Sequence, residues 1–197
     1  PSEIMVVCDR DDIPIEYLVR DMLSQAEHDP DAGAILVTTS TKQAKEVAKR
    51  LKELVPTLPR RNIIEASFAN RSAIIVAEDL SEIFEVINEL APEHLEVLTK
   101  QPFDDLHRIR NAGAIFLGPN TPEPVGDYFA GPNHTLPTSG SAKFSSPLGV
   151  QDFVKTSSVI SYSDKRLQNQ GEQIIRFAEE EGLFAHAAAI KVRLENQ

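Results

Sequence analysis

The chain has 197 residues, 41% of them hydrophobic, which is enough apolar material for one or two globular domains. Its 30 acidic and 20 basic residues give a formal net charge of −10. This charge argues against a nucleic-acid or anionic-membrane binder, because both functions need a basic surface. The single cysteine, Cys8, excludes an internal disulfide, so we expect a reducing, cytoplasmic location. No apolar run approaches the roughly 20 residues of a membrane span.

The amino-terminal part of the chain alternates short apolar runs with amphipathic segments. Glu3–Asp9 and Gly33–Thr39 have the length and composition of buried strands. Ser40 and Gln43 form a capping-box pattern that predicts a second helix, reaching Leu54. A first helix is predicted between the two strands, where apolar residues recur at intervals of three and four: Ile15, Leu18, Val19, Met22 and Leu23.

The same alternation continues toward the middle of the chain. Further strands are predicted over Ile63–Ser67, Ala73–Ala77, His94–Thr99 and Ala112–Leu117. Helices are predicted through Ile83–Leu90, where Pro92 ends the pattern, and over Phe103–Arg110. Strands that alternate with helices of this length predict a parallel or mostly parallel α/β sheet.

The stretch Pro124–Gly140 reads PVGDYFAGPNHTLPTSG and is rich in glycine and proline. These residues favour a loop held in one shape between two strands. Within it, Asp127, Asn133 and His134 are of metal-ligand or substrate-binding type. The alternative is an ordered surface loop without chemistry.

After this stretch the chain becomes mainly helical. Val154–Tyr162 is predicted as one more strand, followed by helices over Asp164–Glu181 and Phe184–Leu194, with Gly182 as the stop between them. We therefore expect two domains, an α/β domain over residues 1–148 and a helical arm over residues 149–197.

Gln25 and His28 lie near the end of the first predicted helix. At 100° per residue, Gln25 falls at the edge of the apolar stripe and His28 about 60° further round the same side, while Glu27 points to the opposite face. Two neutral metal-ligand types thus share one side of the helix. The alternative role of His28 is an interaction with the helix dipole.

Glu93 and His94 follow Pro92 and enter a predicted strand. An adjacent Glu and His can act as two proton-transfer groups. Side chains alternate in an extended segment, so the two reach one site only if the backbone bends there; the alternative is an ordinary helix-to-strand turn. His186 lies early in the last helix, shortly after Glu181 and Gly182. Neither G-x-G-x-x-G nor the P-loop pattern occurs, so neither standard loop binds a nucleotide here.

Several motifs occur together in a fixed order: PSE at the start, MLSQAEHDPD, APEHLE, AGAIFLG, PVGDY, GPNHTLPTSG, AKFSS and EEGLFAHAAAI. In this order, and over essentially the whole chain, they closely resemble the histidinol dehydrogenase family. The resemblance implies part of a doubly wound, Rossmann-like, mostly parallel sheet followed by a helical C-terminal dimerisation arm. It also implies a zinc-dependent, NAD-linked enzyme of histidine biosynthesis, which oxidises L-histidinol to L-histidine through an aldehyde.

The resemblance assigns roles to residues of this sequence. It implies that Glu93 and His94 are the acid–base pair and that the chain forms a homodimer, with Glu181 and His186 contributed across the interface. The implied zinc ligands are Gln25, His28, Asp127 and His186. The implied substrate-binding residues are these four ligands together with Ser2, His94, His134 and Glu181.

The sequence departs from the family pattern at Pro132 and Phe129, neither of which is an implied ligand. A larger departure is length, because family members are roughly twice as long and their other half carries most NAD contacts. No NAD-binding residue is therefore assigned here, and we expect no turnover from this chain alone. One alternative is a non-catalytic folded or dimerising fragment that binds zinc or no ligand. Another is a zinc hydrolase, which explains the ligands and Glu93 but not the remaining motifs.

Overall fold

The computed structural model describes residues 2–195. It divides into two compact units, Pro1–Phe153 and Val154–Gln197, whereas the sequence predicted a boundary after residue 148. Each unit is described by itself.

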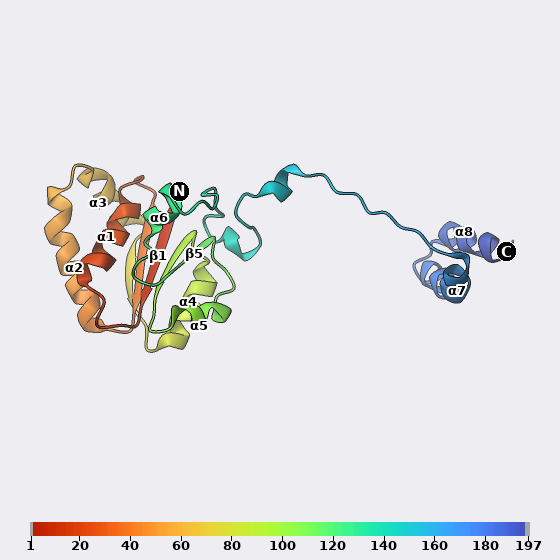
Figure 1. Ribbon diagram of the computed structural model, residues 1–197, viewed down its shortest axis with the longest axis horizontal. Coiled ribbons are helices and arrows are strands. Elements are labelled where there is room, and N and C mark those ends of the chain that lie inside the picture. The colour runs from red at the N-terminus through yellow and green to blue at the C-terminus, as the bar shows by residue number, and fades with distance from the viewer. Residues whose placement is uncertain (1, 196–197) are drawn as a thin grey trace. The chain divides into compact units, whose positions relative to one another are not determined.

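The first unit is built on a sheet whose paired strands are all parallel (Figure 1). In the described residues its order is β3-β2-β1-β4-β5. Crossovers therefore run outward in both directions from the adjacent central strands β1 and β4, as in a doubly wound fold. This confirms the predicted fold class. The strands are β1 (Glu3–Cys8), β2 (Gly33–Thr38), β3 (Ala73–Val76), β4 (His94–Leu98) and β5 (Ala114–Leu117).

Helices cover both faces of the sheet (Figure 1). On one face, α1 (Ile15–Ala26), α2 (Thr41–Leu54) and α3 (Arg61–Asn70) pack against Ile4, Val6 and Cys8 of β1. On the other, α4 (Leu80–Leu90) packs against Met5 and Val7. This is the alternation expected of a strand buried on both sides. Shorter elements complete the unit: η1 (Val55–Thr57), α5 (Pro102–Asp105), η2 (Leu106–Arg108), α6 (Glu123–Tyr128), η3 (Ser141–Lys143) and η4 (Val150–Phe153).

Two predicted strands are wrong. Residues 63–67 belong to α3, because Ile64 and Ser67 lie one turn apart on its buried side, where Ser67 Oγ donates to the carbonyl of Ala32 at 2.9 Å. Residues 154–162 form neither helix nor strand, and Val159 and Ile160 are 94% and 83% exposed. Their β-branched composition favours a strand, but in the described residues they pair with no neighbouring strand.

The loop predicted over Pro124–Gly140 is also partly wrong. Its first residues, including Asp127, lie in the short helix α6. No strand follows it in the described residues; the next element is the 3₁₀ turn η3. Pro124 sits in the first turn of α6, a position where the missing N–H of proline costs nothing.

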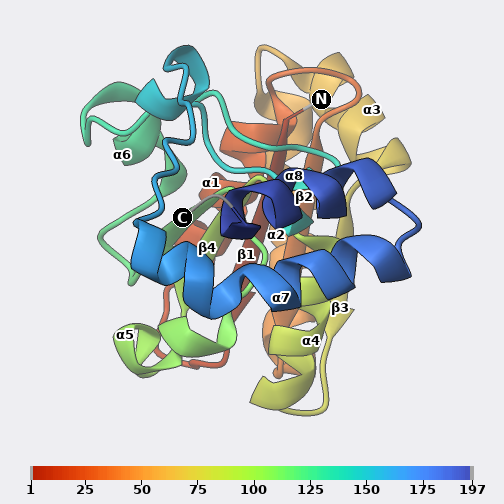
Figure 2. The same ribbon diagram turned by 90° about the vertical axis from the view of Figure 1, so that its right-hand side faces the viewer.

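The second unit is a pair of helices, α7 (Asp164–Glu180) and α8 (Phe184–Glu195), that lie side by side (Figure 2). Ile175, Ala178 and Ala187 form its small core. The predicted stop at Gly182 is confirmed: its φ of 74° is left-handed, and the N–H of Leu183 donates to the carbonyl of Ala178 at 2.8 Å. Across the described chain, no helix has both the length and the apolar character needed to cross a membrane.

Candidate active site at the amino-terminal edge of the sheet

The chemistry-bearing residues of the first unit gather where β1 and β4 begin. The two strands are neighbours, with Ile4 opposite His94, so Ser2 and Glu3 come close to Glu93. In open α/β sheets, ligands usually bind beyond the carboxyl ends of the strands at the switch point. Here the candidate residues lie instead at the amino ends of the strands. The fold class alone would not predict this location.

Glu93 and His94 are brought together by the way α4 ends. Ala91 takes a left-handed conformation with φ 51°, and Pro92 then turns the chain into β4. Glu93 Oε2 accepts hydrogen bonds from Ser2 Oγ at 2.9 Å and from the N–H of Glu3 at 2.8 Å. Glu93 Oε2 also lies 3.6 Å from His94 Nδ1. Both side chains therefore reach the start of β1.

The hydrogen bond of His94 determines which ring nitrogen is basic. His94 Nδ1 lies 2.9 Å from the carbonyl oxygen of Glu3. A carbonyl can only accept, so Nδ1 carries the proton, and Nε2 holds the free lone pair of the neutral ring. Nε2 lies 3.9 Å from Glu123 Oε1. The basic nitrogen thus faces α6, away from the strand backbone.

Gly113 allows β5 to approach the backbone of Glu93 closely. The carbonyl of Glu93 accepts a hydrogen bond from the N–H of Ala114 at 2.8 Å. A Cβ on Gly113 would lie 2.5 Å from that carbonyl oxygen, well inside van der Waals contact. Only glycine fits at this position, so the placement of Glu93 depends on it.

Helix α6 supplies the other wall of the site. His94, Glu123 and Asp127 each offer a ligand atom within 4.8 Å of the other two. Asp127 Oδ1 also lies 3.4 Å from His134 Nδ1, although the His134 side chain is 64% exposed. The structure therefore brings the sequence-predicted Asp127 and His134 close to each other, and Asp127 close to His94.

Behind this wall lies a chain of buried carboxyl groups that the sequence interpretation missed. Glu96 Oε1 accepts a hydrogen bond from the N–H of Glu123 at 2.6 Å. Burial, then the negative charge of Asp21, raise the pKa of Glu96 to about 9. Burial, then the hydrogen bond to Asp127, raise the pKa of Glu123 to about 8, and burial raises that of Asp21 to about 6. The one available sequence signal was a glutamate in the middle of the apolar run HLEVL.

Gln25 is the buried residue whose polar groups lack partners. It is 1% exposed, and neither its Oε1 nor its Nε2 has a hydrogen-bond partner among the described residues. Gln25 follows Asp21 by one turn of α1, and His94 precedes Glu96 by two strand residues; each step is about 6 Å. The Asp21 side chain forms a hydrogen bond with Glu96 of β4, so Gln25, one turn further along α1, lies on the same side of the helix as that contact. A buried amide without a hydrogen-bond partner indicates a site where a ligand can bind.

His28 is not on α1, contrary to the prediction. The helix ends at Ala26, because Pro30 has no N–H to donate to the carbonyl of Ala26 four residues earlier, and its ring would clash with that carbonyl in a continued helix. His28 is exposed, and Arg60 holds its segment from outside: Nε donates to the carbonyl of Glu27 at 2.7 Å and Nη2 to that of His28 at 3.3 Å. Among the described residues, the cluster of possible metal ligands around Asp127 does not include His28.

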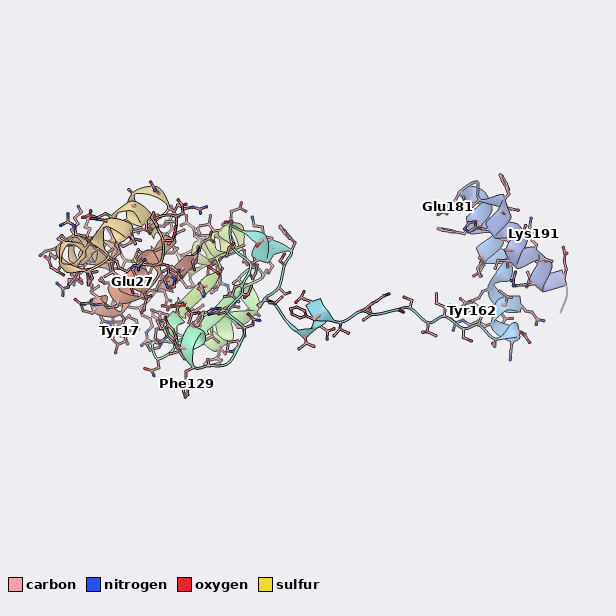
Figure 3. The ribbon with its side chains drawn as sticks, turned by 90° about the horizontal axis from the view of Figure 1, so that it is seen from above. Tyr17, Glu27, Phe129, Tyr162, Glu181 and Lys191 are labelled. Carbon is pink, nitrogen blue, oxygen red and sulfur yellow. The ribbon has the colours of Figure 1, made fainter. Side chains whose placement is uncertain are left out.

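The remaining predicted residues, Glu181 and His186, belong to the second unit. Both are exposed, and Figure 3 shows Glu181 at one end of this helix pair. The two residues border one hollow at the turn between α7 and α8, which Phe177 and Leu183 also line. Glu181 is the last residue before Gly182, and His186 lies in the first turn of α8. A carboxylate and an imidazole thus share one face of this unit.

The donor set suits zinc, which takes imidazole nitrogen and carboxylate oxygen ligands. The clearest sign of fit is the orphaned amide of Gln25, whose oxygen is left free to bind a cation. Separately, one imidazole and two carboxylates, all of zinc-ligand type, lie within 4.8 Å of one another: His94, Glu123 and Asp127.

Comparison with known proteins identifies the family of this chain. The family model for histidinol dehydrogenase matches residues 1–194. Histidinol dehydrogenases of Halalkalibacterium halodurans and Geobacillus kaustophilus are both 56% identical, over 100% and 99% of this chain. The crystal structure of histidinol dehydrogenase from Elizabethkingia anophelis matches with a TM-score of 0.90 and 35% identity, over 99% of this chain and 45% of that one. The chain covers only 46% of the length of either curated relative. It belongs to the histidinol dehydrogenase family.

Proposed function

We propose that this chain contributes the zinc and acid–base residues of an NAD-linked enzyme that oxidises L-histidinol to L-histidine in histidine biosynthesis. The observation that carries the proposal is the pairing of Glu93 and His94 at the start of β1. The buried amide of Gln25, which has no hydrogen-bond partner among the described residues, supports it. Two proton-transfer groups at one edge suit a reaction with two successive oxidations. Membership of the family supports the same conclusion.

Four residues would hold the metal: Gln25, His28, Asp127 and His186. When bound, zinc supplies a Lewis acid that orients the substrate through its nitrogen atoms. Ser2, His134 and Glu181 would contact the substrate. Glu181 and His186 would come from the second subunit of a homodimer, and the single buried Cys8 fits a reducing compartment such as the cytoplasm.

His94 would act first, accepting the hydroxyl proton of the alcohol at Nε2 while the carbon transfers its hydride to NAD⁺. The hydrogen bond of Nδ1 to Glu3 fixes the tautomer for this step. Glu93 would then take a proton from the water that adds to the aldehyde. The resulting hydrate anion would transfer the second hydride to a second NAD⁺ and become the carboxyl group of L-histidine. Both hydrogen bonds to Glu93 end on Oε2, so Oε1 is the oxygen left to receive that proton.

Zinc content tests the site directly. We expect the purified chain to retain zinc by atomic absorption, and His28→Ala to lower the retained amount. His107→Ala is the matched control, because His107 is exposed and its Nδ1 contacts only the carbonyl of Asp104 in its own turn. Equal zinc in all three proteins, or none in any, would favour the non-catalytic fragment instead.

Substrate binding and turnover separate the two halves of the proposal. Calorimetry should show that L-histidinol binds the zinc-loaded chain and binds His28→Ala more weakly. A steady-state assay with L-histidinol and NAD⁺ should show no turnover by the chain alone, which spans under half of its relatives. Clear activity would contradict that expectation.

A further inference from the structure

We propose that Glu96 is a positioning residue that fixes α6 against β4 and thereby sets Asp127 and Glu123 beside His94. The role rests on the proposed function only in that α6 carries the proposed zinc ligand Asp127. That Glu96 holds α6 against β4 is a statement about packing alone, and it does not depend on a bound metal.

The position of Glu96 is unusual for a carboxyl group. Every residue of β4 is buried, and Glu96 is 1% exposed. Alternation along the strand places it between His94 and Leu98, on the side that packs against α1. Burying a carboxyl costs free energy unless it is hydrogen-bonded, so a glutamate in this apolar run implies a partner that needs it.

Glu96 has two such partners, the carboxyl of Asp21 on α1 and the first N–H of α6. The 2.6 Å hydrogen bond from the N–H of Glu123 to Glu96 Oε1 joins the middle of the strand to the start of the helix. The N-cap residue of α6 is Pro122, whose side chain accepts no hydrogen bond, and Pro124 has no N–H to donate. Glu96 therefore supplies from the sheet the acceptor that a capping side chain usually supplies locally.

Helix α6 has little else to hold its first turn. It has six residues, too few for an isolated helix to be stable. Val125 is 38% and Tyr128 82% exposed, and Phe129, 94% exposed, points away from the unit (Figure 3). Glu123, by contrast, is 2% exposed. The close packing of Gly126 on the Phe116 ring and the buried Glu123 side chain near His94 also hold the helix.

The consequence for the site follows from helix geometry. Asp127 lies one turn after Glu123, so both side chains extend from the same side of α6. Any shift of the first turn moves Asp127 together with Glu123 relative to His94. Glu96 acts only through α6 and, in this role, touches neither the substrate nor the metal.

Two substitutions separate positioning from folding. Glu96→Leu keeps an apolar side chain in the core but removes the acceptor, whereas Glu96→Gln keeps an acceptor oxygen. Glu85→Leu on the exposed side of α4 is the matched control. We expect amide hydrogen exchange at Glu123 to quicken by about tenfold or more in Glu96→Leu and to stay near the native rate in Glu96→Gln and Glu85→Leu. Zinc affinity should fall about 10- to 100-fold in Glu96→Leu alone.

An unchanged exchange rate at Glu123 in Glu96→Leu would overturn the proposal. So would unfolding of both Glu96→Leu and Glu96→Met, because the residue would then support the sheet rather than the helix. If the unmodified chain binds no zinc, the proposed zinc site fails, and the exchange comparison still decides the role of Glu96.

Discussion

The candidate site has two sides that are held in different ways. On the β4 side, Glu93, His94 and Glu96 are buried, and each has hydrogen-bond partners in the protein. On the ligand side, Gln25 is buried without a partner and His28 is exposed. The proton-transfer residues are thus organised by the fold itself, while the buried amide of Gln25 has no hydrogen-bond partner among the described residues. Binding a cation would give the ligand side its missing partner and leave the hydrogen bonds of the β4 side unchanged.

The largest expected effect comes from breaking the organised side. Gly113→Ala places a Cβ 2.5 Å from the carbonyl oxygen of Glu93, so the start of β4 must move. We expect a loss of about 3 kcal/mol in the free energy of unfolding, measured by urea denaturation. Gly149→Ala is the control, since its added Cβ would have no contact closer than 3.9 Å. Similar losses in the two variants would contradict the role assigned to Gly113.

Zinc should act on the other side alone. At free zinc 100-fold above its dissociation constant, the unfolding free energy should rise by about 2.7 kcal/mol. Gln25→Met replaces an unpartnered amide by an apolar side chain, so the metal-free protein should gain about 1 kcal/mol while the zinc response disappears. Thermal and urea unfolding with zinc or chelator measure both changes. A metal-free Gln25→Met that loses stability would mean that the amide already has a partner.

The buried carboxyl of Glu96 makes the organised side sensitive to pH. Its pKa is raised to about 9 by burial and by the charge of Asp21, above the ordinary value of 4.5. A raised pKa gives stability that is complete below pH 4.5 and is lost as the pH rises toward 9. Relative to Glu96→Gln, the native protein should lose about 2 kcal/mol of unfolding free energy between pH 5 and about pH 6.5 in urea titrations. Parallel pH profiles of the two proteins would contradict the raised pKa.

Much of the fold could be predicted from the sequence, because periodicity reports burial directly. Ile15 to Leu23 revealed α1, and the apolar run at Glu3–Asp9 revealed β1. The strand predicted at residues 154–162 failed because a strand needs a neighbour, and composition does not show whether one exists. A single motif was enough to propose Glu93 and His94 as a pair, which stays a prediction, but the carboxyl network could not be found this way. Asp21, Glu96 and Glu123 meet only after three separate elements have packed.

The smallest expected effect concerns the outer support of the ligand side. Arg60 holds the carbonyls of Glu27 and His28 from the surface, where hydrogen bonds contribute only about 1 kcal/mol because water competes for the same groups. Arg60→Ala should therefore cost about 1 kcal/mol or less in unfolding free energy. Zinc affinity should nevertheless fall by a few-fold, since the segment that carries His28 becomes free to move.

Arg61→Ala provides the control, because Arg61 is adjacent, similarly exposed and paired only with Glu65 on its own helix. Calorimetric titration measures the zinc affinity of the two variants, each of which lacks one positive charge at neighbouring positions. An equal loss of affinity in both would show that net charge, and not the hold on His28, sets the effect. A loss of zinc affinity confined to Arg60→Ala would mean that the exposed, weak contact of Arg60 with the Glu27 and His28 carbonyls keeps His28 in place for the metal.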